Sequence, residues 1–334
     1  MQFDFTEDQH EIKRTAKDLL AQRSTSEKVR TAAESGSYEQ SLWAELAELG
    51  WPGVAISEDH SGGGLGIIEL ATLLEEGGYA LANSPLLASA ACAIAIQEAG
   101  SDAQKKEWLP KLASGQVTGS FGIAGQTFPD LVDAAITVSV SPDGSSATLI
   151  DVSAAECNAV ETIDPTRRYG EFSEADQSGE GMPGDGAAAL DISTVIVSAE
   201  LVGICQRALD MTVEYVKDRK QFGRPVGSFQ AVQHRCAQML LNTEAARSVT
   251  YYAAWSADAD RSLLPEASAL AKSSASKAGV EVTGSAIQAH GGIGFTWEAD
   301  VHWFYKRAQM DAAWLGGTKT HRERLTRIAA AQAA

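Results

Sequence analysis

The C-terminal half of the chain carries three long stretches in which apolar residues recur at helical spacing. They run from Val195 to Lys217, from Phe229 to Ala257 and from Pro265 to Gln288, and short turns separate them. Long helices joined by short turns pack side by side in alternating directions. This half of the chain is therefore expected to form an antiparallel helical bundle.

Helical patterns also alternate with short breaks near the start of the chain. Thr6 precedes an acidic and then amphipathic stretch, which predicts a capped helix. Further helices are expected over Ser41–Leu49, ended by Gly50, and over Ile67–Leu81. The sequence SEDHSGGGLG before the last of these has no Lys-Ser/Thr after its glycines. We therefore interpret it as a wide loop between helices and not as a phosphate-binding loop.

A small β region is predicted between the two helical parts. The sequence AAITVSVSPDGSSATLIDV alternates apolar and polar residues around a Pro-Asp-Gly turn, which indicates a β-hairpin. The acidic sequence SEADQSGEGMPGDGA follows, and its lack of apolar periodicity predicts an exposed, mobile connection.

The order of these patterns predicts an α+β fold that is mainly α. Three domains are expected: an N-terminal helical domain over residues 1–118, a reduced middle β domain with the acidic Gly/Ser-rich loop over residues 119–190, and a C-terminal four-helix bundle over residues 191–334.

The composition excludes several classes of function. A formal net charge of −17 argues against binding nucleic acid through a basic surface. The longest apolar run, Ser84–Ile96, is shorter than the roughly 20 residues that cross a bilayer, so it predicts a buried helix and no membrane association. The first residues lack the features of a signal peptide. The four cysteines are Cys92, Cys157, Cys205 and Cys236. They lack the spacing of a zinc site or of a disulfide framework. We therefore expect no metal and a cytoplasmic location.

The densest polar cluster, KDRKQFGRPVGSFQAVQHR, spans residues 217–235. Arg219 ends one expected helix, Phe222 lies in a tight turn, and Gln230 begins the next helix. A guanidinium group beside a helix N-terminus and an amide offers donors suited to a phosphate. A solvated charged turn is an equally good interpretation of this cluster taken alone.

A second cluster, QAHGGIGF, spans Gln288–Phe295 at the end of an expected helix. Its glycine pair lets the backbone approach a ligand closely. Taken alone, a glycine helix cap is the better interpretation. His290 by itself is more typical of a side chain that stabilises a turn than of a base or a metal ligand.

Five segments together carry a family resemblance: FDFTEDQHEIK, LGWPGVAISEDHSGGGLG, YVKDRKQFGRPVGSFQAVQHR, QAHGGIGF and FYKRAQ. In this order and at these separations they resemble the acyl-CoA dehydrogenase family. The resemblance covers nearly the whole chain and is strongest from Ala199 to Thr318. It implies the three-domain fold above, bound FAD, and oxidation of the Cα–Cβ bond of an acyl thioester. A carboxylate would remove the α proton while the β hydrogen leaves as hydride to the flavin.

The resemblance also implies which residues contact the cofactor. Arg219, Phe222 and Gln230 match the first FAD motif of the family. The second motif is matched by Gln288, Ala289, His290, Gly291 and Gly292. In the family these motifs serve the pyrophosphate and adenosine end of an FAD held mainly by the neighbouring subunit. FAD is therefore expected at a subunit interface.

The expected catalytic base is missing. The sequence WLGGT, residues 314–318, places Gly316 where most family members have the catalytic glutamate. Some relatives carry the base at the start of the first bundle helix, and Ser193 falls there. Glu200 lies seven residues further on and is a weak candidate for a relocated base, although a role on the helix surface or in capping is the better expectation. No catalytic residue is therefore assigned.

The middle region departs from the family as well, because the segments that usually pack against the flavin ring have no match here. This pattern resembles the shorter, non-catalytic subunits of heteromeric acyl-CoA dehydrogenases that actinobacteria use on steroid-derived thioesters. It implies a homologous catalytic partner in an α2β2 assembly, with the acyl-CoA bound mainly on that partner. Two alternatives stay open: a self-sufficient homo-oligomeric enzyme with a relocated base, and a flavin-free scaffold subunit.

Overall fold

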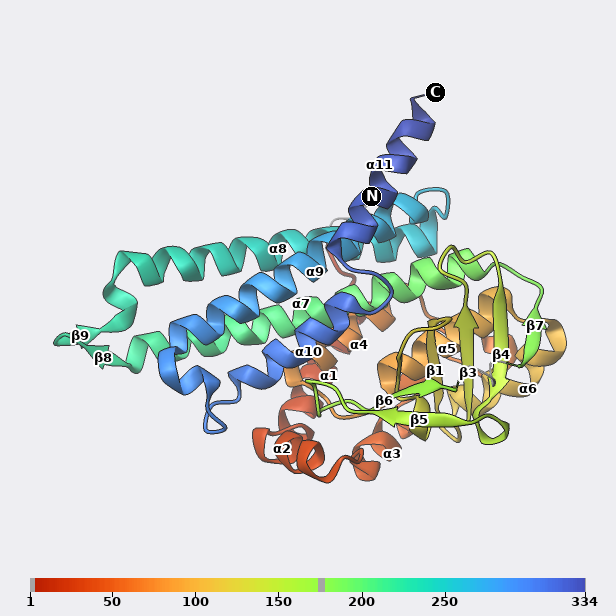
Figure 1. The fold of residues 1–334 in the computed structure, drawn as a ribbon, viewed down its shortest axis with the longest axis horizontal. Coiled ribbons are helices and arrows are strands. Elements are labelled where there is room, and N and C mark those ends of the chain that lie inside the picture. The colour runs from red at the N-terminus through yellow and green to blue at the C-terminus, as the bar shows by residue number, and fades with distance from the viewer. Residues whose placement is uncertain (1–3, 174–177, 334) are drawn as a thin grey trace.

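The computed structural model describes residues 4–173 and 178–333, and it shows a mainly helical fold with a small β region in the middle of the chain (Figure 1). The α+β prediction is therefore confirmed. The N-terminal part contains the helices α1 (Glu7–Arg23), α2 (Ser26–Ser35), α3 (Gln40–Glu48), α4 (Ile67–Ala80), α5 (Leu86–Ala99) and α6 (Asp102–Ala113). The C-terminal part contains α7 (Gly186–Asp218), α8 (Gln230–Ala259), α9 (Leu264–His290), α10 (Val301–Ala313) and α11 (Thr318–Gln332).

The N-terminal helices begin where their capping residues predict. Thr6 caps α1 in a capping box, in which its side chain accepts a hydrogen bond from the Gln9 backbone and the Gln9 side chain accepts one from the Thr6 backbone. The expected helix over Ser41–Leu49 is α3, shifted by one residue. The apolar run from Ser84 contains α5, most of which is buried, as predicted.

The β region consists of two small sheets. One has the strand order β1 (Gly119–Ile123), β3 (Ile136–Val140), β4 (Ala147–Asp151), β7 (Glu180–Met182), and the other has the order β2 (Phe128–Pro129), β6 (Tyr169–Phe172), β5 (Cys157–Val160). The predicted hairpin is β3 and β4, which pair from Ile136 opposite Asp151 to Val140 opposite Ala147. The acidic connection is not wholly irregular, because β7 pairs with β4 within it. Residues 178–185 of this connection are exposed, as predicted, except for Met182, and α7 begins at Gly186. Residues 174–177 of the connection lie outside the described residues.

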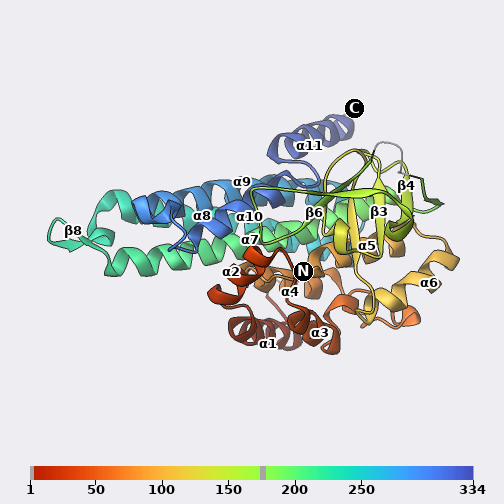
Figure 2. The ribbon, with the colours of Figure 1, turned by 60° about the horizontal axis from the view of Figure 1, so that its bottom comes forward.

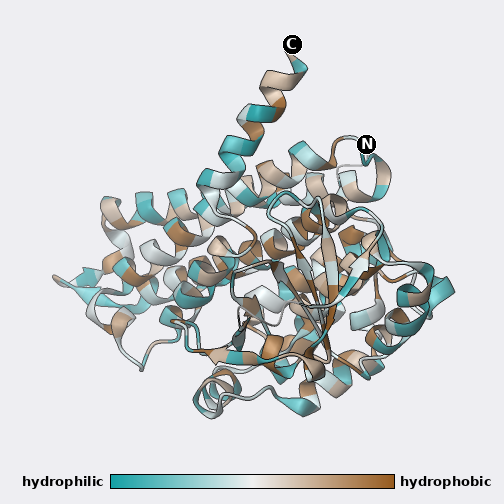
Figure 3. Cartoon of the chain, turned by 45° about the vertical axis from the view of Figure 1, so that its right-hand side comes forward, coloured by the Kyte–Doolittle hydropathy of each residue, from teal (hydrophilic) through white to brown (hydrophobic). Residues whose placement is uncertain are grey.

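The bundle helices are longer than the sequence pattern predicts. Helix α7 has 33 residues and begins at Gly186, where Asp185 accepts a hydrogen bond from the Ala188 backbone, and not at Val195. Helix α9 packs against α7, α8, α10 and α11. In Figure 2 the strands gather at one end of the long helices, with α5 and α6 against them, while the turn after α7 lies at the other end. Helix α11 projects from the body and carries hydrophilic residues along its length (Figure 3).

Two glycines let α4 and α7 cross at close range. A Cβ on Gly203 would lie 1.8 Å from the carbonyl oxygen of Glu75, and one on Gly78 would lie 2.2 Å from that of Glu200. Both distances are far below contact distance, so neither helix could sit here with a larger residue. Because Glu200 lies at this crossing, its side chain is buried.

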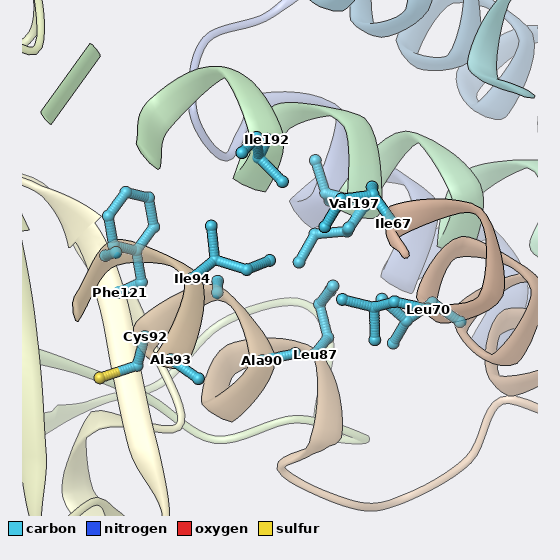
Figure 4. Close-up of a cluster of buried hydrophobic side chains, with 14 of the residues drawn as sticks. Ile67, Leu70, Leu87, Ala90, Cys92, Ala93, Ile94, Phe121, Ile192 and Val197 are labelled. Atoms are coloured by element: carbon cyan, nitrogen blue, oxygen red, sulfur yellow. The ribbon is translucent and has the colours of Figure 1, made fainter. Parts of the chain in front are cut away.

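The largest apolar core joins the N-terminal helices, the first sheet and α7. Figure 4 shows Ile94 of α5 between Phe121 of β1 and the α7 residues Ile192 and Val197. Helix α7 is long and apolar enough to cross a membrane, but 89% of its most apolar window is buried inside the protein. Its hydrophobicity is therefore explained by its position as the central core helix.

Candidate functional site

The turn that contains Gly316 has a backbone that disfavours any side chain. Gly316 has a φ of +92° and the preceding Leu315 has a φ of +58°. A Cβ on Gly316 would lie 3.1 Å from Cγ2 of Thr320 and 3.3 Å from Nε2 of His321. The same His321 Nε2 donates a hydrogen bond to the carbonyl oxygen of Leu315 at 3.0 Å. A glutamate at this position would therefore be strained by the left-handed backbone and would press on the side chains of Thr320 and His321.

Ser193 offers no substitute for that carboxylate. It lies in α7 with its side chain fully buried. Within the described part of the chain, its hydroxyl has no hydrogen-bond partner. A serine in this position is a small core residue and has no proton acceptor that would activate it.

Glu200 is buried and is held by two arginines. Its carboxylate accepts hydrogen bonds from Nη2 of Arg167 at 2.8 and 2.9 Å and from Nη1 of Arg307 at 3.0 Å. The expectation of a role on the helix surface or in capping is therefore wrong, because the close crossing of α4 and α7 carries this part of α7 through the core. The oxygens of Glu200 are also already occupied by two guanidinium groups, which argues against Glu200 as a base.

These contacts belong to a larger buried ion cluster. Arg167 also binds Asp311 of α10 at 2.8 Å, and Nε of Arg307 binds Asp164 at 2.6 Å. Asp130, whose carboxylate accepts a hydrogen bond from Tyr38, lies at its edge. The cluster therefore ties the middle β region to the bundle and to the N-terminal helices.

Burial shifts the pKa values of several groups in and beside this cluster. It raises the pKa of Asp311 to about 8 and that of Asp130 to about 7, with the neighbouring carboxylates adding to the rise. Burial lowers the pKa of Lys272 to about 7. The Lys272 ammonium group donates to the carbonyl oxygens of Asp311 and Ala312 at 2.8 and 3.0 Å, so it secures the end of α10 just before the Gly316 turn.

The ion cluster leaves little room around Glu200. The cavity that touches Arg167 and Glu200 is lined mainly by residues of the N-terminal part and has a volume of about 10 Å³. That volume is about enough for one water molecule. Glu200 therefore has no room beside it for a substrate.

The other end of the bundle is open and exposed. Arg219 caps α7, and a short hairpin of β8 (Lys220–Gln221) and β9 (Arg224–Pro225) follows it. Phe222 at the hairpin turn has a φ of +53° and is 91% exposed. Gln230 begins α8 and is also exposed. These three side chains are therefore available to something outside this chain.

The second motif lies next to the first. The ring of His290 at the end of α9 stacks on Tyr215 of α7, with 4.4 Å between centroids, and its Nδ1 donates to the carbonyl oxygen of Ala286 at 2.7 Å. His290 thus stabilises the turn, and its burial lowers its pKa. A Cβ on Gly291 or Gly292 would meet no atom within 4 Å, so the backbone there is open to a ligand. Gln288 is exposed and Ala289 is half-buried.

The bundle end therefore fits part of an anionic cofactor. It presents a guanidinium group, an amide and unobstructed backbone on one exposed surface, which suits phosphate and adenosine groups. The sequence pattern missed the ion cluster, although single charges such as Glu200 and Arg307 within otherwise apolar helical stretches could have indicated it.

Comparisons with known proteins agree with this arrangement. The descriptions "Acyl-CoA dehydrogenase, N-terminal domain" and "Acyl-CoA dehydrogenase, C-terminal domain" match residues 6–116 and 181–330. Acyl-CoA dehydrogenase IpdE2 of Mycolicibacterium smegmatis is 34% identical over 328 residues, which cover 96% of this chain and 98% of that protein. The chain belongs to the acyl-CoA dehydrogenase family.

Solved structures place the acyl-CoA dehydrogenase fold of this chain beside heteromeric members. A structure of the Tcur3481–Tcur3483 steroid ACAD has a TM-score of 0.88 and 27% identity, with 98% of this chain and 99% of that chain covered. The ChsE4–ChsE5 complex of Mycobacterium tuberculosis has a TM-score of 0.87 and 24% identity over 99% of each chain, and it supports the fold.

Proposed function

We propose that this chain is the non-catalytic subunit of a hetero-oligomeric, FAD-dependent acyl-CoA dehydrogenase. The observation that carries the proposal is the turn at Gly316, whose backbone and neighbours oppose the glutamate that the reaction needs. Glu200, the remaining candidate, is neutralised by Arg167 and Arg307. The proposal places the base on a homologous catalytic partner.

In this proposal the open end of the bundle completes the partner's FAD site. FAD, when bound, accepts the hydride that leaves the β carbon of the acyl thioester. Arg219 would donate hydrogen bonds to the phosphates, and Gln230 would donate its amide hydrogens beside it. The backbone of Gly291 and Gly292 would contact the adenosine end, while His290 positions that turn through its contact with Tyr215.

The proposed assembly and substrate follow from the same contrast between a missing base and exposed cofactor-binding motifs. The similar structures named above include complexes of two different chains, which favours a heteromer of the α2β2 type over a homo-oligomer. The acyl-CoA would bind mainly on the partner, and a steroid-derived acyl group agrees with the description of one of these structures. A cytoplasmic location and a division into residues 1–118, 119–190 and 191–334 complete the proposal.

The alternative of a self-sufficient enzyme would require as its base Glu200, whose oxygens already accept hydrogen bonds from Arg167 and Arg307. The alternative of a flavin-free scaffold would leave the exposed Arg219 and Phe222 without a function. Flavin content distinguishes all three hypotheses.

Substitution of one arginine tests the shared cofactor site. In the complex purified with its partner, Arg219→Ala is expected to lose most of the bound FAD, because a charge-assisted contact to phosphate contributes about 1.5–3 kcal/mol. Flavin per complex is measured by absorbance. Lys106→Ala on α6, at the far end of the molecule, is the control and should retain its flavin. Full retention in Arg219→Ala would contradict the assignment.

A further inference from the structure

A pocket of about 390 Å³ lies between the N-terminal helices and the bundle. The end of α1, the start of α2, the end of α4, the middle of α7 and the start of α10 form its walls. Its apolar lining comprises residues from all five helices: Leu20, Val29, Leu81, Met211 and Phe304. Its size falls in the range of small-molecule pockets, which is about 300–1,000 Å³.

Two cations in the lining border the ring of Tyr79. Lys17 and Arg207 both line the pocket, and within residues 4–173 and 178–333 neither has a carboxylate at salt-bridge distance. The Lys17 ammonium group and the Arg207 guanidinium group lie 5.7 and 5.4 Å from the centroid of that ring. Two positive charges that border one apolar pocket attract an anion.

The two carboxylates in the lining do not cancel this charge, because cations outside the lining already pair with them. Glu76 lies 3.6 Å from the ammonium group of Lys13, and Asp300 lies 3.1 Å from the guanidinium group of Arg30. Burial also raises the pKa of Glu76, which reduces its negative charge. Lys17 and Arg207 are therefore the charges in the lining that remain available to an anion.

The pocket also contains an unused hydrogen-bond donor. Trp303 of α10 lines it and is 3% exposed, and its indole N–H has no partner among the described residues. Buried donors are nearly always satisfied in folded proteins. An acceptor on a bound molecule would satisfy this one.

We propose that this pocket binds a small amphipathic anion, with its apolar body against Leu20, Leu81 and Phe304 and a single carboxylate, sulfonate or phosphate group at Lys17 and Arg207. The site is formed by this chain alone. It does not depend on the FAD contacts proposed above. Those contacts lie at the C-terminal end of α7 and beyond it, whereas the pocket lies against the middle of α7.

Binding of 8-anilinonaphthalene-1-sulfonate to the full chain tests this proposal. The fluorescence titration is expected to show one saturable site from which decanoate displaces the dye and the uncharged 1-decanol does so at least roughly tenfold less well. Arg207→Gln should weaken dye binding by roughly tenfold, because it removes one charge-assisted contact. Ala21→Trp, which places an indole in the pocket from an exposed position on α1, should abolish the site.

The controls separate this site from other apolar surfaces. Lys106→Gln on α6 should bind the dye as the unmodified chain does, and thermal melts verify that each variant is folded. Dye binding that is unchanged in both Arg207→Gln and Ala21→Trp, equal displacement by decanoate and 1-decanol, or no saturable binding at all would overturn the proposal.

Discussion

At the scale of single residues, Gly316 shows how a backbone conformation can disfavour the glutamate that the family resemblance predicts at this position. A φ of +92° is readily adopted by glycine and strained for glutamate. The side chain of His321 occupies part of the space in which a carboxylate would begin. A glutamate introduced here by a single substitution would therefore be strained.

Substitution of Gly316 and of its neighbour Gly317 by glutamate tests whether the turn is strained by a side chain at residue 316. Gly316→Glu is expected to lower the free energy of unfolding by about 1–3 kcal/mol, because it forces a side chain into a left-handed backbone conformation. Gly317→Glu is the matched control, since Gly317 has an extended backbone and its nearest Cβ contact would be at 3.5 Å. Urea unfolding measures both. Equal stability of the two variants would show that the turn tolerates a glutamate after all.

His321 gives the same turn a dependence on pH. Its burial, together with the charge of Lys272, lowers its pKa to about 4 from an ordinary value of about 6.5. Because the unfolded chain binds the proton more tightly, this group stabilises the fold above pH 6.5, and that stability is lost as the pH falls toward 4. Between pH 7 and pH 5 the loss amounts to about 2 kcal/mol.

Substitution isolates this contribution. His321→Gln should remove about 2 kcal/mol of the change in unfolding free energy between pH 7 and pH 5, measured by urea unfolding at both values. The raised pKa of Asp311 acts in the opposite direction but is present in both proteins, so it cancels in the comparison. His234→Gln, at an exposed position on α8, should leave the pH dependence as it is. An unaltered pH dependence in His321→Gln would contradict the account.

At the scale of elements, the sequence predicts the helices and the hairpin but not what joins them. Capping residues and apolar periodicity are local signals, so α1, α3, α5 and the β3–β4 hairpin lie close to their predicted positions. The ion cluster is long-range, because Arg167 and Arg307 meet Glu200 only after three parts of the chain have packed. A single charged residue in a helical pattern does not say which distant residue will neutralise it.

Of the adjacent glycines Gly77 and Gly78 on α4, only Gly78 faces the backbone of α7 at the crossing of the two helices. Gly78→Ala is expected to destabilise the protein by about 1–3 kcal/mol, because the added methyl group overlaps the backbone of α7. Gly77→Ala meets no atom within 4 Å and should be neutral or stabilising by up to about 1 kcal/mol. Thermal unfolding compares the two. Similar melting temperatures would indicate that the helices can separate at little cost.

At the scale of the whole molecule, the two ends of the bundle have different characters. The part near the β region is buried and contains the ion cluster, whereas the end with Arg219 and the Gly291–Gly292 turn is exposed. Local motifs identify the exposed end from the sequence. The ion cluster near the β region forms only when distant parts of the chain pack together. The sequence therefore indicated a difference in this region only through the absence of the segments that usually pack against the flavin ring.

The central claim is that this chain binds FAD only together with a catalytic partner. The most direct measurement is the visible flavin spectrum and the mass of the chain purified alone and after co-expression with homologous acyl-CoA dehydrogenase chains. The account predicts a colourless protein alone and a yellow hetero-oligomer with the partner. A yellow homo-oligomer from the lone chain would contradict it and would return the search to a base within this chain.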